Sequence, residues 1–285
     1  MISTIAQLDP RCKQIPDCWV KPLHDWETYL RAGGASDATL TTRLAHARRI
    51  ARAMKVPPAA VQPEEMLAWL AARNWALETR RSCNAALRSL WGYLMATGAV
   101  DRDVSAAVPR VTTSRGKPRP LGDVAYGEAL ASADDRTSLI LQLSAEMGMR
   151  RGEIALVHND DLVEDLAGTS LVVHGKGRKT RVLPMTDRLA RRVRKACHEG
   201  GGWAFPGQID GHLSPGYVGV LAHQVLVANK LHQGRHRFAT KALRSGANLM
   251  VVKELLGHES LATTQIYLAV AGDELRAAVE AVAAT

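Results

Sequence analysis

The sequence predicts a mainly helical protein of two domains: an N-terminal helical bundle, and a second domain that combines helices with a small β-sheet. Three observations carry this prediction. Apolar residues recur at helical spacing through most of the chain. A basic, proline-broken segment at 106–120 divides it, and a short alternating run after residue 169 indicates strands. A length of 285 residues with 46% hydrophobic content suits folded domains with their own cores.

The first domain is expected over residues 1–105. Ser36 and Asp37 open a helix with Leu40, Leu44 and Ile50 on one face. A second helix begins at Pro63, and a third runs over 78–95. Arginines line other faces of these helices and basic residues continue into the 106–120 linker, giving as candidate nucleic-acid contacts Arg43, Arg48, Arg80, Arg81, Arg88, Arg115 and Lys117.

The second domain is expected over residues 121–270. A strongly apolar helix covers about 137–149, and a β-hairpin is predicted from 170–174 and 179–184 around Gly175-Lys176-Gly177. After a turn at the glycines 200–202, helices resume through 215–270. Residues 271–285 carry one apolar stripe and are expected to form a short last helix.

The positive charge lies mostly in the N-terminal part. Of the net charge of +9, residues 1–120 hold 18 Lys and Arg against 10 Asp and Glu, whereas residues 121–285 hold 19 against 18. A basic domain attracts polyanions, but charge alone equally suits an inert basic surface. The four cysteines contain no Cys-x-x-Cys pair, and neither a signal peptide nor an 18-residue apolar run is found. We therefore expect a cytoplasmic protein that meets no membrane.

The second domain contains residues suited to phosphate chemistry. Arg150 ends the apolar helix, and Lys176 stands at the tip of the hairpin. His232, Arg235 and His236 fall at i, i+3 and i+4, on one face of a helix. Each alone has an ordinary structural interpretation, as does Tyr267 in its helix. Together they supply charge clamps, proton donors and acceptors, and a nucleophile for transfer at a phosphodiester.

The spacing of His232 and His236 also suits metal ligands. The metalloprotease motif needs Glu directly after the first His, where this chain has Gln233, and no acidic third ligand is evident nearby. A metal-dependent hydrolase is therefore the weakest alternative, and we expect neither a metal nor another cofactor.

Five motifs, in order, resemble the tyrosine recombinase (phage integrase) family. They are Gly-Met-Arg-Arg-Gly-Glu (148–153), Gly-Lys-Gly (175–177), His-Gln-Gly-Arg-His (232–236), Leu-Leu-Gly-His (255–258) and Thr-Thr-Gln-Ile-Tyr (263–267). The resemblance spans 17–270 and implies a SAM-like core-site-binding bundle followed by the family's catalytic domain. Gly234 departs from the pattern, because the family usually has Leu there. Met147 and Met149 also depart from it, because they replace the commoner Thr and Leu of the first arginine motif.

The resemblance implies a role for each motif residue. Arg150 and Arg235 would clamp the scissile phosphate, with His258 adding a hydrogen bond, and Tyr267 would attack to leave a 3′-phosphotyrosine. Lys176 would protonate the departing 5′ oxygen and His232 would orient or deprotonate the nucleophile, while Glu153 would support the site structurally.

The implied activity is site-specific recombination of double-stranded DNA attachment sites through a Holliday junction, by a homotetramer in which residues 271–285 dock into a neighbouring subunit. Integration or excision of a phage or mobile element is the main expectation, with a directionality factor or a DNA-bending host protein as further candidate partners. The alternatives are Xer-like resolution of chromosomes or plasmids, a type IB topoisomerase, and a non-catalytic DNA-binding regulator.

Overall fold

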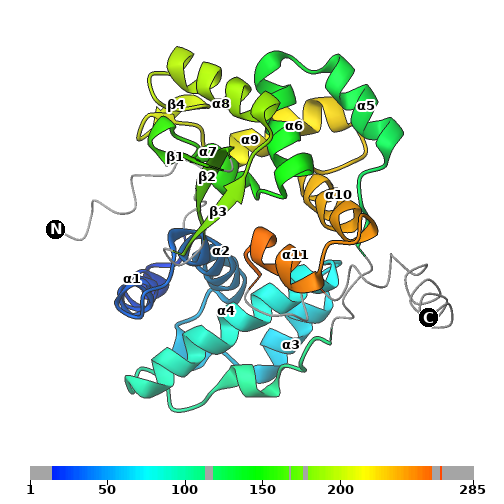
Figure 1. The fold of residues 1–285 in the computed structure, drawn as a ribbon. Coiled ribbons are helices and arrows are strands. Elements are labelled where there is room, and N and C mark those ends of the chain that lie inside the picture. Colours follow the sequence, from blue (N-terminus) through cyan, green and yellow to red (C-terminus); the bar gives the residue numbers. More distant parts are fainter. Residues whose placement is uncertain (1–14, 113–117, 167, 176–178, 259–263, 265–285) are drawn as a thin grey trace, which may run out of the picture. The chain divides into compact units, whose positions relative to one another are not determined.

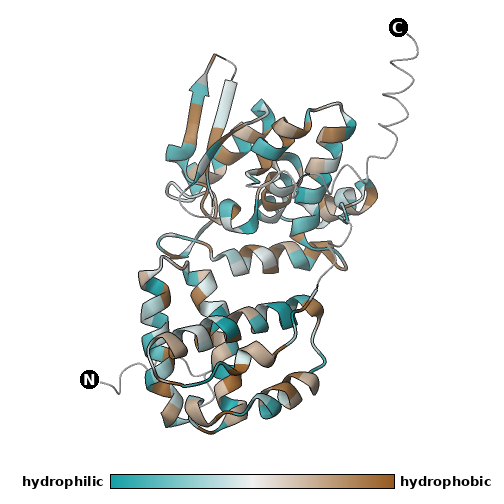
Figure 2. Cartoon of the chain, turned by 90° about the horizontal axis from the view of Figure 1, so that it is seen from below, coloured by the Kyte–Doolittle hydropathy of each residue, from teal (hydrophilic) through white to brown (hydrophobic). Residues whose placement is uncertain are grey.

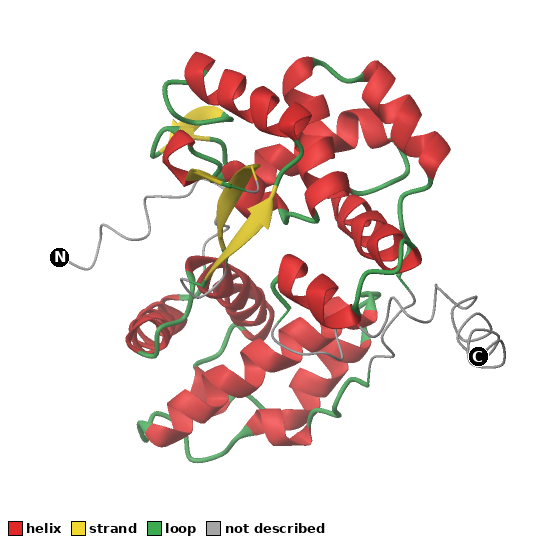
Figure 3. Ribbon diagram, viewed as in Figure 1, coloured by secondary structure: helices red, strands yellow, loops and turns green. Residues whose placement is uncertain are grey.

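The computed structural model describes residues 15–112, 118–166, 168–175, 179–258 and 264. The chain divides into two compact units, Met1–Arg115 (unit 1) and Gly116–Thr285 (unit 2), which Figure 1 colours along the sequence. Helices dominate both units and strands are few (Figure 3), as the sequence predicts. Among the described residues, no helix combines the length and apolarity needed to cross a membrane.

Unit 1 is a helical bundle. Its helices are α1 (Asp17–Ala32), α2 (Asp37–Met54), α3 (Pro63–Ala71) and α4 (Leu77–Ala96), with short 3₁₀ turns at Pro58–Ala60 and Val104–Ala107. The backbone N–H of Thr39 donates to the Ser36 hydroxyl at 3.4 Å, which caps α2 at its predicted start. The three predicted helices are therefore confirmed, and α1 adds a fourth.

Tryptophans form the centre of the unit 1 core. Trp19, Trp26 and Trp91 are fully buried, and the rings of Trp19 and Trp91 meet edge to face with centroids 5.9 Å apart. Hydrophobic and hydrophilic residues alternate around the helices, as amphipathic packing requires (Figure 2). Val108 also packs into this core, so the first residues of the 106–120 segment fold with unit 1.

Unit 2 surrounds a second core with seven described helices. They are α5 (Asp123–Ser132), α6 (Asp135–Met147), α7 (Arg151–Ala155), α8 (Asp187–Glu199), α9 (Pro215–Leu226), α10 (Leu231–Arg244) and α11 (Leu249–Leu256), with a 3₁₀ turn at Asn159–Asp161. The predicted apolar helix is α6. It ends at Met147 because Gly148 adopts a left-handed conformation (φ 68°) that reverses the chain.

A three-stranded antiparallel sheet completes unit 2. Its strands β1 (Leu162–Asp165), β2 (Gly168–His174) and β3 (Thr180–Pro184) are ordered β1-β2-β3, and a short strand β4 (Pro206–Ile209) lies apart from them. Ser170 pairs with Pro184 and His174 with Thr180, which confirms the predicted hairpin. The sequence analysis missed β1, because a four-residue strand with two acidic residues carries little alternation.

Gly234 allows α10 to lie close against α6. A Cβ at position 234 would stand 2.8 Å from the Ser144 hydroxyl, which donates to the Leu231 carbonyl at 2.9 Å. A glycine in the middle of a helix lowers its stability relative to alanine. In this chain the close packing of α10 on α6 explains why glycine stands there.

Several predicted functional residues fall outside the described residues. They are Arg115, Lys117, Lys176 and Tyr267, together with the C-terminal segment 271–285.

Candidate active site

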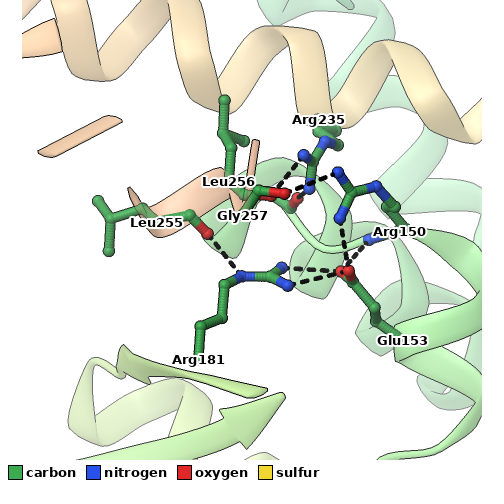
Figure 4. Close-up of polar contacts among 8 residues, drawn as sticks. Arg150, Glu153, Arg181, Arg235, Leu255, Leu256 and Gly257 are labelled. Carbon is green, nitrogen blue, oxygen red and sulfur yellow. Dashed lines mark hydrogen bonds and ion pairs between the residues drawn. The ribbon is translucent and has the colours of Figure 1, made fainter. Parts of the chain in front are cut away.

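Two predicted arginines converge on the carboxyl end of α11. Arg150, which immediately precedes α7, donates from Nη2 to the Gly257 carbonyl at 3.2 Å. Arg235 of α10 is 1% exposed and donates to the carbonyls of Gly148 and Leu256, both at 2.6 Å. Figure 4 shows both guanidinium groups meeting this helix end. Segments far apart in the sequence thus bring two fixed positive charges to one point.

Glu153 holds Arg150 in place through two hydrogen bonds. Its carboxylate accepts the Arg150 backbone N–H at 2.8 Å and the Arg150 Nη1 group at 2.7 Å. Burial raises the pKa of Glu153, but hydrogen bonds from Arg181 and Arg150 and the charge of Arg181 outweigh burial, so the pKa lies below its usual value. The carboxylate is therefore ionised at neutral pH, in the supporting position that the sequence analysis expected.

Arg181 is a site residue that the sequence analysis missed. It lies on β3 and donates from Nη1 and Nη2 to the two oxygens of Glu153, at 2.9 and 2.8 Å, and from Nε to the Leu255 carbonyl at 2.8 Å. A signal was present, because strand alternation places Arg181 on the same face as the buried Leu183.

The histidines of α10 lie on one face, as predicted. The rings of His232 and His236 meet edge to face, with centroids 4.5 Å apart. The His232 side chain reaches solvent, but partial burial of its ring lowers its pKa. The charges of Arg235 and Arg150 lower the pKa further. Burial, His232 and Arg235 lower the pKa of His236 to about 4. Both imidazoles are therefore neutral at neutral pH.

His258 follows the left-handed cap of α11 at Gly257. Its Nδ1 lies 2.9 Å from the hydroxyl of Thr264, which is fully buried. Burial, followed by the charges of Arg235 and Arg150, lowers the pKa of His258 to about 4. A neutral ring can donate one hydrogen bond and accept another, according to its tautomer.

Gln233 caps the N-terminal end of α10. Its side-chain oxygen accepts the Lys230 backbone N–H at 2.7 Å, which caps the helix. In the described part of the chain, no group of three or more His, Cys, Asp or Glu residues is placed to hold a metal ion.

The candidate DNA contacts of unit 1 differ in their surroundings. Arg48 is half-buried and Arg81 exposed, while Arg43 donates to the Ser89 hydroxyl at 3.2 Å. Arg80 donates to the carbonyls of Leu70 and Arg73 at the end of α3, and Arg88 donates to the Val108 carbonyl at 2.6 Å. Arg80 and Arg88 therefore help to hold unit 1 together, which the sequence analysis did not foresee.

The site combines guanidinium groups with neutral imidazoles. Arginine side chains bind the non-bridging oxygens of a phosphate, and a neutral imidazole can donate one hydrogen bond and accept another. Backbone carbonyls and Glu153 hold the two arginines in fixed positions, which is the form of electrostatic preorganisation that favours phosphoryl transfer.

Known proteins match this chain along most of its length. The family model described as the phage integrase family matches residues 125–274. The tyrosine recombinase XerC of Methylobacterium nodulans is 33% identical over 267 residues, covering 84% of this chain and 82% of that protein. The tyrosine recombinase XerD of Caulobacter vibrioides is 31% identical over 231 residues, covering 72% of this chain and 75% of that protein.

The fold has a counterpart among solved structures. A lambda integrase dimer (75–356) bound to a COC′ core site superimposes with a TM-score of 0.71 at 18% identity, covering 87% of this chain and 94% of the other. This likeness shows the fold, whereas the family model and the curated relatives show the family. The chain belongs to the phage integrase family of tyrosine recombinases, enzymes that cleave and rejoin DNA.

Proposed function

We propose that this protein is a site-specific recombinase in which Tyr267 attacks a DNA phosphate and forms a 3′-phosphotyrosine. The observation that carries the proposal is the convergence of Arg150 and Arg235 on the end of α11, from which the chain continues through His258 toward Tyr267. The phosphotyrosine keeps the energy of the broken bond, so that rejoining needs neither a nucleotide nor a metal.

Each site residue has a proposed task. Arg150 and Arg235 clamp the non-bridging oxygens, and His258 donates a hydrogen bond to the developing charge. Lys176 protonates the 5′ oxygen that departs, and His232 orients or deprotonates the Tyr267 hydroxyl. The lowered pKa of His232 supports the second task, because a base must be unprotonated near neutral pH.

DNA binding is proposed for unit 1 together with the basic linker. The contacts are Arg43, Arg48, Arg80, Arg81, Arg88, Arg115 and Lys117, with Arg80 and Arg88 also supporting the fold. We place the reaction in the cytoplasm on nucleoid DNA, in a homotetramer that passes through a Holliday junction. In this assembly residues 271–285 dock into a neighbouring subunit, and a directionality factor or a DNA-bending host protein is a further candidate partner.

A covalent-adduct assay tests this activity. Purified protein is mixed with nicked duplexes tiled across the DNA that flanks its own gene, and the products are denatured in SDS. We expect a DNA-shifted protein band that disappears in Tyr267→Phe. Adduct formation that persists in Tyr267→Phe would contradict the assignment of the nucleophile, and its absence with every duplex would favour a non-catalytic DNA-binding protein.

Two biological uses of this activity are distinguished by their substrates. Integration or excision of a phage or mobile element is the main proposal, and Xer-like resolution is the second, which the curated relatives named XerC and XerD favour. Once the cleaved site is known, plasmids that carry it are tested for recombination. Joining to a different site on chromosomal DNA supports integration, whereas recombination between two identical copies alone supports resolution. Relaxed plasmid without any joined product would instead indicate a topoisomerase.

A further inference from the structure

Three arginines hold three consecutive carbonyl groups at the end of α11. Arg181 donates to Leu255, Arg235 to Leu256, and Arg150 to Gly257, at 2.8, 2.6 and 3.2 Å. The last carbonyls of a helix have no partner within it and carry its partial negative charge. Figure 4 shows the three guanidinium groups reaching this helix end from β3, α10 and the start of α7.

Glu153 connects two of these three arginines. Its side chain is 4% exposed and accepts from both Arg150 and Arg181. The Glu153 Oε1 atom is shared, because Arg150 Nη1 stands 2.7 Å from it and Arg181 Nη1 stands 2.9 Å from it. The position of the Arg150 guanidinium therefore depends on how Arg181 engages the same carboxylate.

Arg181 differs from Arg150 in its access to a ligand. The side chain of Arg181 is 11% exposed, against 40% for Arg150, and three of its five N–H groups are used by Glu153 and Leu255. Arg150 can thus meet a phosphate from solvent, whereas Arg181 faces the protein.

We propose that Arg181 is a positioning residue for DNA cleavage. It neutralises the charge of Glu153, so that Arg150 faces the phosphate, and it holds the end of α11 that leads to His258. This inference rests on the proposed function. Without Arg181, the buried carboxylate has only Arg150 to neutralise it, and the Arg150 guanidinium turns toward Glu153 and away from the phosphate. Lysine at this position keeps the charge but loses the two-pronged hydrogen bond and the contact to Leu255.

The test is single-turnover adduct formation at saturating nicked duplex, with DNA affinity and thermal unfolding measured in parallel. Because misplacing a reacting group by about 1 Å costs about 100-fold in rate, we expect Arg181→Met to cleave about 100-fold more slowly than wild type. Arg181→Lys should fall between the two. The Kd for DNA should change by less than about threefold, because the phosphate contacts elsewhere are kept. The matched control is Arg194→Met, which removes a half-buried arginine that binds Glu164 and Thr169 and neither Glu153 nor the end of α11, and which should leave the rate unchanged.

A double variant separates positioning from general stability. Glu153→Gln removes the charge that Arg181 balances, so Arg181→Met should slow Glu153→Gln by far less than it slows wild type. If Arg181→Met alone unfolds, Arg181→Lys takes its place, and its effect is compared in the wild-type and Glu153→Gln backgrounds. A rate for Arg181→Met within threefold of wild type would overturn the inference, and so would a full 100-fold loss in both backgrounds. If wild-type protein forms no adduct at all, the proposed function itself fails, and the coupling is not measured.

Discussion

Two arginines of unit 1 and two of unit 2 lie in different surroundings. In unit 1, Arg48 and Arg81 lie at least partly in solvent, on helices that pack through buried tryptophans. In unit 2, Arg181 and Arg235 are enclosed and bind backbone carbonyls or Glu153. Residue type alone therefore does not assign a role. A surface guanidinium contributes charge, whereas an enclosed one contributes a fixed direction.

The largest effect is expected from Arg235. Arg235→Met leaves the carbonyls of Gly148 and Leu256 without their donor, so the free energy of unfolding should fall by about 3 kcal/mol. Adduct formation should fall by about 100- to 1,000-fold, as when one preorganised donor is removed from a transition state. Urea titration and single-turnover cleavage measure the two losses. A stable Arg235→Met that still cleaves at the wild-type rate would show that this enclosed arginine is not needed in a fixed position.

The sequence revealed the members of this site more fully than their contacts. The spacing of His232 and Arg235 predicted their shared helix face, because helical periodicity is local. The carbonyl that Arg150 binds belongs to Gly257, 107 residues away, and no local pattern predicts such a contact. Arg80 and Arg88 were predicted only as DNA contacts, because a basic helix face looks the same in sequence whether its arginines meet phosphate or backbone.

The packing of α10 on α6 should tolerate little added volume. Gly234→Ala brings a methyl group against the Ser144 hydroxyl, and we expect a loss of about 1 kcal/mol although alanine favours a helix. Ser144→Ala in the same chain should recover part of it, because the contacting oxygen is gone. Thermal unfolding of the two single variants and the double variant provides the measurement. A stabilised Gly234→Ala would show that α10 can shift freely and does not fix Arg235.

Acid should weaken unit 2 through its neutral histidines. The pKa values of His236 and His258 are lowered to about 4, so between pH 6.5 and about 4 the unfolded chain binds more protons than the folded one. Stability from these groups is present above pH 6.5 and is lost as the pH falls through this window. Thermal unfolding from pH 7 to pH 4 should show a shallower decline in His236→Asn and His258→Asn. Parallel curves for wild type and both variants would contradict this assignment.

The smallest effect on folding is expected in unit 1. Arg48→Ala should change the free energy of unfolding by no more than about 0.5 kcal/mol, because its side chain lies partly in solvent. It should weaken DNA binding and reduce the slope of log K against log salt by about 1, as expected for one lost phosphate contact. Binding titrations at several salt concentrations measure the slope. An unchanged slope would remove Arg48 from the proposed DNA contacts.

The residue that becomes joined to DNA can be identified directly. The covalent adduct is digested with a protease and a nuclease, and the peptide that retains a nucleotide is sequenced by mass spectrometry. We predict a 3′-phosphodiester link to Tyr267, in the segment that follows His258. A nucleotide on any other residue, including the four remaining tyrosines Tyr29, Tyr93, Tyr126 and Tyr217, would contradict the proposal that the arginines at the end of α11 serve cleavage by Tyr267.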